Sequence, residues 1–192
     1  MLDERGTVAA LKEAFKNFGY HVSFHEGTIF VRTAIWAFEI DEYCIPAKIL
    51  ATIVEHIGQI PRIPAAYIVQ KDRDPGTTCM LDDELNYLEK IRAMAEKAKT
   101  PIRRTGLWLD GHEIWQTRQG LKVRPMDPRY TRIIEAEALK TARVQMEDDR
   151  PGSYIAFKGF VGTAIVQGIE HRAEDGKLAR IEDFPWLGES GE

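Results

Sequence analysis

The chain has 192 residues, of which 44% are hydrophobic and 29% charged, a composition typical of one good-sized globular domain or two small ones. Its longest apolar stretches contain about ten residues, half of what a membrane-spanning helix requires, so no such helix is predicted. The formal net charge of −4 argues against a general nucleic-acid binder, and the first residues lack the pattern of a secretory signal, so we expect a cytoplasmic protein.

The first part of the chain alternates helices with strands. The spacing of its apolar residues predicts a helix at about 7–18, a hairpin at 20–33, a continued or third strand at 35–40, a helix at 46–57 and a buried strand at 65–69. Glu26–Gly27 is the expected two-residue turn of the hairpin. The resulting register places Arg32 opposite His21, which disfavours a cation site at this histidine.

The second part is predicted to be richer in strands. We expect a helix at 81–99, two-residue turns at Asp110–Gly111 and Gln119–Gly120, a helix at 127–146, strands at 153–159 and 163–172, and a hairpin turn at Asp175–Gly176. Together these elements predict an α+β fold in which antiparallel β-hairpins and meanders pack against about four α-helices. The sections 1–72 and 79–192 form either two units or one continuous domain.

Positive charge is concentrated in one segment of this acidic chain. Residues 97–132 contain nine Lys or Arg and three Asp or Glu residues, so the remainder of the chain carries a net charge of −10. Such asymmetry indicates an anionic partner. The alternative is that the basic segment packs beside acidic helices and is neutralised within the fold.

The two turns of this segment predict which side chains share a face of a small sheet. If both turns contain two residues, Gly106 pairs with Trp115 across the first turn, and Trp115 pairs with Arg124 across the second. Alternation along the strands then gathers apolar side chains on one face. The opposite face carries Arg104, Trp108, Trp115, Lys122 and Arg124.

This second face has three possible roles. Cations attract phosphates and indoles stack on bases, a combination that suits nucleic acid. Trp and Arg are equally the usual anchors of protein–protein interfaces. The third interpretation is that both indoles are buried, with the basic groups at the rim. Arg129 and Arg132, which follow at the start of the predicted fourth helix, extend the candidate binding surface.

Catalytic motifs are poorly supported. His25–Glu26 and His112–Glu113 begin like a zinc-protease motif, but Ile29 and Gln116 stand where the second histidine is required. The two cysteines are isolated, which excludes a paired zinc-binding motif. Asp175–Gly176–Lys177 has an acid-x-lysine spacing seen in metal-dependent nucleases, although a solvated hairpin turn explains it better.

The sequence therefore predicts a non-enzymatic binding or accessory protein without a cofactor or a resident metal. Its basic, Trp-containing region, about 103–132, is expected to bind an acidic protein surface or nucleic acid, and to regulate or inhibit a nucleic-acid enzyme in one version of this hypothesis. The alternative is a small metal-dependent hydrolase or nuclease that uses scattered His and Asp/Glu residues. Helices rich in apolar residues are also compatible with the interface of a homo-oligomer.

Overall fold

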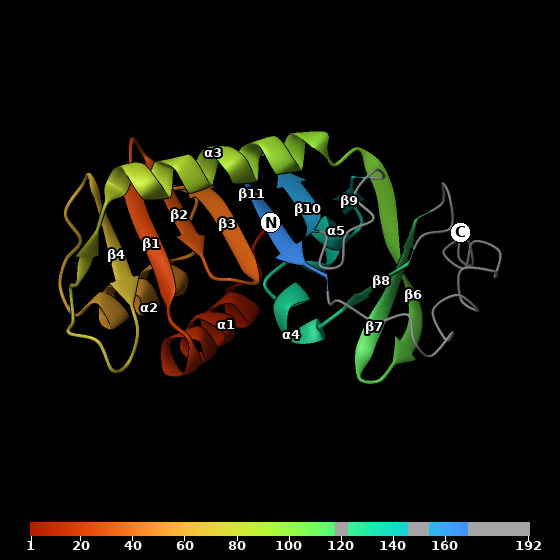
Figure 1. The fold of residues 1–192 in the computed structure, drawn as a ribbon, viewed down its shortest axis with the longest axis horizontal. Helices are drawn as coiled ribbons and strands as arrows, with labels where there is room; N and C mark the ends of the chain where they lie inside the picture. Colours follow the sequence, from red (N-terminus) through yellow and green to blue (C-terminus); the bar gives the residue numbers. More distant parts are fainter. Residues whose placement is uncertain (118–122, 146–153, 169–192) are drawn as a thin grey trace.

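The computed structural model describes residues 1–117, 123–145 and 154–168 (Figure 1). Within them, antiparallel pairing places eleven strands in the order β5-β4-β1-β2-β3-β11-β10-β9-β6-β7-β8. The strands are β1 (Tyr20–His25), β2 (Thr28–Arg32), β3 (Trp36–Asp41), β4 (Ala65–Val69), β5 (Thr78–Cys79), β6 (Thr100–Leu109), β7 (His112–Thr117), β8 (Val123–Met126), β9 (Arg143–Val144), β10 (Tyr154–Gly159) and β11 (Gly162–Gln167).

Three of the predicted helices are present. They are α1 (Glu4–Asn17), α2 (Ala47–Ile57) and α3 (Leu81–Lys97). The first begins earlier than its apolar pattern indicates, because Asp3 caps it by accepting a hydrogen bond from the Gly6 amide at 2.6 Å. Thr7, where the apolar pattern places the start of this helix, lies inside it; it is buried and donates to the Ile133 carbonyl at 3.3 Å.

The β1–β2 hairpin has the predicted turn and register. Glu26 and Gly27 both have positive φ angles, 45° and 75°, as a two-residue turn with the right twist requires. His21 lies opposite Arg32. Beyond this hairpin, β3 pairs with β11, which comes more than 120 residues later and joins the two halves of the sheet.

Helices cover both faces of the sheet. Figure 1 shows α3 running along one face, with α1 and α2 on the other. The main core lies under α1 and α2 and combines residues from Leu2 to Val166. A smaller core under α3 contains Phe30, Leu88 and Ile165. Phe30 lies opposite Ser23 in the β1–β2 hairpin and is buried together with Leu88 of α3.

The prediction of one helix at 127–146 is wrong. A helix does begin at the predicted place, with Asp127 as its cap and Pro128 as its first residue. However, α4 (Pro128–Thr131) ends after four residues, and α5 (Ala136–Leu139) is equally short. Residues 133–135 leave helical geometry because they pair with the N-terminus: Asp3 donates to the Ile133 carbonyl, and Glu135 donates to the Met1 carbonyl. Both Ile133 and Ile134 are thereby buried.

The remaining elements agree with the α+β class, although the antiparallel sheet dominates over the helices. The β10–β11 hairpin lies close to its predicted position, whereas the turn at 175–176 falls outside the described residues. Among the helices of the described segments, none has the length and apolar character needed to cross a bilayer.

Candidate functional site

The β6–β7 hairpin carries the residues predicted to form a basic, Trp-containing surface. Its turn is the expected Asp110–Gly111, with φ angles of 49° and 82°, and it pairs Trp108 with Glu113. The predicted register then fails, because Thr105, Gly106 and Leu107 form an irregular stretch in which Gly106 has a φ of 75°. Trp115 therefore lies opposite Arg104 rather than Gly106.

The two indoles have different environments. The Trp108 side chain is 57% exposed, whereas Trp115 is completely buried. The Trp115 ring packs edge-on against Phe157 of β10, with 6.2 Å between ring centroids, and its N–H donates to Glu113 at 3.2 Å. The expectation that Trp115 lines an exposed binding surface is therefore wrong, because this face of β7 packs into the main core.

Arg104 shares a face with Trp108 and binds the same buried acid as Trp115. Trp108 and Arg104 lie opposite Glu113 and Trp115, which are two residues apart on β7, so all four side chains point to one side of the hairpin. The half-exposed Arg104 donates through Nε to Glu113 Oε1 at 2.6 Å. Glu113 thus links the core indole to a surface cation.

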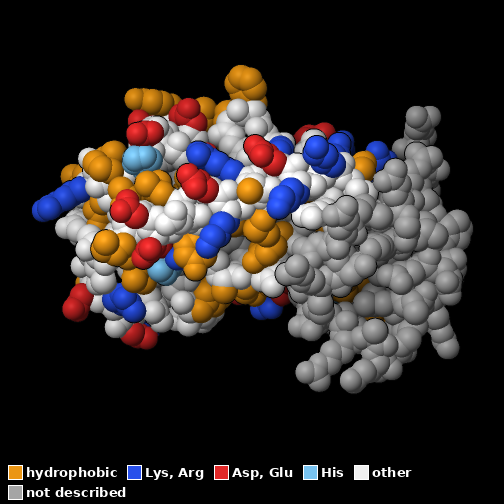
Figure 2. Space-filling model, turned by 45° about the horizontal axis from the view of Figure 1, so that its top comes forward, with side chains coloured by type: hydrophobic (Ala, Val, Ile, Leu, Met, Phe, Trp, Pro, Cys, Tyr) orange, Lys and Arg blue, Asp and Glu red, His pale blue; other side chains and the backbone are white. Residues whose placement is uncertain are grey.

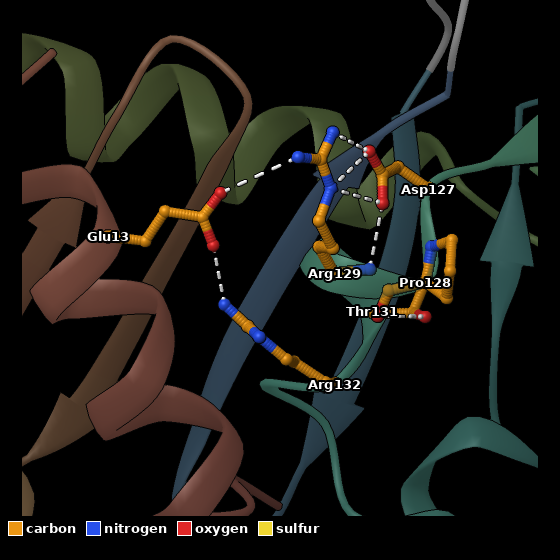
Figure 3. A network of polar contacts seen from close by, with 6 residues as sticks. All are labelled: Glu13, Asp127, Pro128, Arg129, Thr131 and Arg132. Carbon is orange, nitrogen blue, oxygen red and sulfur yellow. Dashed lines mark hydrogen bonds and ion pairs between the residues drawn. The ribbon is translucent and has the colours of Figure 1, made fainter. Parts of the chain in front are cut away.

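Arg129 and Arg132 are committed to ion pairs within the fold (Figure 3). Arg129 donates to both carboxylate oxygens of Asp127, the shortest contact being 2.6 Å. Arg132 donates at 2.6 Å to Glu13 of α1, whose second oxygen lies 3.7 Å from Arg129. Burial raises the pKa of Asp127, but the hydrogen bonds from Arg129 outweigh it and lower that pKa below its ordinary value.

This network supports the alternative of neutralisation inside the fold for the end of the basic segment. Glu13 lies on α1, more than 110 residues before both arginines, so charge counts along the sequence could not reveal the pairing. Lys122 lies outside the described residues. Arg124 pairs with Trp115 through the β8 backbone as predicted, and its side chain falls outside the described part.

A basic hollow remains beside the hairpin. Its volume is about 470 Å³, and it is lined by Arg103, Arg104, Ala136, Leu139 and Lys140. The two arginines come from β6, and Lys140 follows directly after α5. Sequence analysis missed Lys140 because it lies outside the segment with excess positive charge.

The basic side chains of this hollow differ in whether a carboxylate of the protein binds them, and in how exposed that pair is. Arg103 is exposed and has no carboxylate partner in the described residues. Lys140 contacts Glu137 at 2.9 Å, but both side chains are more than 70% exposed. An exposed pair of this kind contributes little energy, so a carboxylate from a partner can replace Glu137. Trp108 stands four residues from Arg104 on the same strand, at most about 13 Å away along it.

A second cluster gathers potential metal ligands. Within the described ranges, His21, Cys79 and Glu84 form the one group whose ligand atoms all lie within 4.8 Å of each other. Arg32 occupies this cluster: it donates to both oxygens of Glu84, at 2.6 and 2.7 Å, and stacks 3.9 Å from the Tyr87 ring centroid.

The charges of this cluster favour a structural ion pair over a metal centre. Burial alone would raise the pKa of Glu84, yet hydrogen bonds from His21 and Arg32 lower it to about 2. Burial and the adjacent Glu84 raise the pKa of the Cys79 thiol to about 11, which keeps the thiol protonated and a poor metal ligand. The guanidinium already supplies the positive charge that a cation would bring.

These residues therefore give little support to the alternative of a metal-dependent hydrolase or nuclease. Its other candidate, Asp175–Gly176–Lys177, lies outside the described residues. Comparisons with known proteins assign no activity either: no family model, no curated protein and no solved structure matches this chain.

Proposed function

We propose that this protein binds an acidic segment of a partner protein at the basic hollow between β6 and α5. The observation that carries the proposal is the convergence of Arg103, Arg104 and Lys140 around one hollow. The exposed indole of Trp108 lies further along the same strand, β6. Carboxylates of the partner would bind the cations, and an apolar side chain would pack on the indole.

Two features favour a protein partner over nucleic acid. A nucleic-acid surface neutralises a series of phosphates, whereas Arg129 and Arg132, which would have extended the positive track, are paired with Asp127 and Glu13. An exposed Trp and two arginines on one strand, β6, are residue types that typically anchor protein–protein hot spots. In this proposal the protein acts by binding, as an accessory or regulatory factor.

The test is a titration of the full chain with a fluorescent Asp/Glu-rich peptide at low and moderate salt. We expect Arg103→Ala, Trp108→Ala and Lys140→Ala each to weaken binding by about five- to tenfold, since each removes an interaction of about 1 kcal/mol or more. Lys71→Ala, which removes an exposed charge from the loop between β4 and β5, is the matched control and should leave the affinity unchanged.

Arg104 is left intact in this series because its removal would leave the buried Glu113 carboxylate without its arginine partner. Peptide binding that is absent at low salt, or insensitive to all three variants, contradicts the proposal. Single-stranded DNA that binds more tightly than the peptide, and loses affinity in the same variants, would identify the hollow as a nucleic-acid site instead.

A further inference from the structure

A separate hollow of about 420 Å³ lies between α3 and the β1–β2 hairpin. Its volume falls within the usual range of small-molecule sites. The residues that matter for its chemistry are Ser23, His25, Thr28 and Phe30 from the hairpin, and Leu88 and Glu89 from α3. Phe30 and Leu88 are buried and supply its apolar surface.

Polar groups in this hollow lack hydrogen-bond partners. Ser23 is only 2% exposed, yet its hydroxyl bonds to no group in the described residues, and the Thr28 hydroxyl is likewise unpaired there. His25 Nδ1 is also buried without a partner. Buried polar groups are almost always satisfied. The unpaired Ser23 and His25, with the partly buried Thr28 hydroxyl at the same hollow, therefore point to a ligand that supplies hydrogen bonds.

The lining of this hollow has an excess of acidic residues, since Glu26 and Glu89 outnumber Arg92. Glu89 forms no ion pair in the described part of the chain, and Glu26 has only His25 nearby, at 3.5 Å. Arg92 also lines the hollow, but it binds Glu39 through Nε and Nη2. Figure 2 shows this side of the molecule, where acidic and basic side chains are interspersed along α3 and form no continuous patch of either charge.

We infer that this hollow binds a small aliphatic amine. The ammonium group donates to the Ser23 and Thr28 hydroxyls and to the Glu89 carboxylate, three acceptors that match its three N–H donors. The alkyl chain packs against Phe30 and Leu88. An anionic ligand is disfavoured, because Glu26 and Glu89 in the lining would repel it and the charge of Arg92 is shared with Glu39.

The test uses three probes that are matched in size and differ in charge: butylammonium, 1-butanol and butyrate. They are titrated into the isotopically labelled full chain, and binding is followed through the backbone amide NMR signals. We expect butylammonium to shift the signals of Ser23, Thr28 and Glu89 in a saturable manner. The alcohol should bind at least about tenfold more weakly, because it lacks the charged donor, and butyrate should not bind.

Two variants and a matched control assign the site. Glu89→Gln removes the charge from an exposed position of α3, and Ser23→Ala removes the buried hydroxyl; each should weaken butylammonium binding by about fivefold or more. Glu96→Gln removes an equivalent exposed charge two turns further along α3 and should have no effect. Equal binding of amine and alcohol, or an unchanged affinity in Glu89→Gln, would overturn the inference.

Discussion

Glu84 has a buried carboxylate, and its hydrogen-bond partners offset the cost of burying this charge. It lies in the first turns of α3 and is 2% exposed. A buried charge without a partner is strongly unfavourable, but here Arg32 binds both carboxylate oxygens and His21 approaches one of them at 2.8 Å. These contacts connect β1 and β2 to the start of α3.

We predict that Arg32→Met lowers the free energy of unfolding by about 3–5 kcal/mol at pH 7, because it leaves Glu84 buried and unpaired. The double variant Arg32→Met/Glu84→Met should recover most of this loss, since no charge then remains. Urea denaturation followed by circular dichroism measures both. Arg92→Met is the control, because it breaks a pair whose arginine is half exposed and should cost about 1 kcal/mol or less.

The same pair predicts how stability changes with pH. The pKa of Glu84 falls from its ordinary value of 4.5 in the unfolded chain to about 2 in the folded one. Its stabilisation is therefore complete above pH 4.5 and is lost as the pH falls toward 2. The stability difference between the wild type and Arg32→Met should narrow over this range. A difference that is constant down to pH 2 would show that Arg32 stabilises the fold through packing rather than through the charge of Glu84.

The position of α1 is fixed by its close packing against the backbone at Arg132. Gly6 lies in its first turn, and a methyl group there would overlap the carbonyl oxygen of Arg132, which precedes the residues that pair with the N-terminus. The glycine is therefore required by the approach of another backbone, since helix propensity alone would favour alanine at this position.

We predict that Gly6→Ala destabilises the protein by about 1–3 kcal/mol, as overpacking does. Helix propensity by itself predicts a gain of up to about 1 kcal/mol, so the sign of the change separates the two explanations. Lys12→Gly, at an exposed position of the same helix, is the control and should cost about 1 kcal/mol through propensity alone. Thermal and urea denaturation provide the measurement, and a stabilised Gly6→Ala variant would be incompatible with the close contact.

How far the sequence predicts an element depends on whether its determinants are local. Asp110–Gly111 was sufficient to predict the turn and the first pairs of the β6–β7 hairpin, because Asp and Gly accept positive φ angles. The irregular stretch around Gly106 has no equally clear signal, and it changes the partner of Trp115. Burial of this indole depends on Phe157, about 40 residues away in the chain, which no pattern within the hairpin contains.

At the scale of the whole molecule, the order of the strands matters more than their number. Insertion of β11 beside β3 continues the N-terminal sheet into the C-terminal strands, and the main core accordingly contains residues from both sections. The predicted boundary between 72 and 79 lies in the connection from β4 to β5, two strands that pair with each other. The apolar pattern predicts the individual strands, but their order depends on contacts between distant residues.

A shared core predicts cooperative unfolding. Phe157 of β10 is completely buried, and its replacement by alanine should cost about 3–5 kcal/mol. If the sheet unfolds as one unit, hydrogen exchange should accelerate by the same factor in β1–β3 as in β10 and β11, although β1 makes no pairing with the substituted strand. Phe160→Ala, at a fully exposed position of the same hairpin, is the control and should change stability by no more than about 0.5 kcal/mol. Faster exchange confined to β9–β11 would instead mean that the two sections unfold independently despite their continuous sheet.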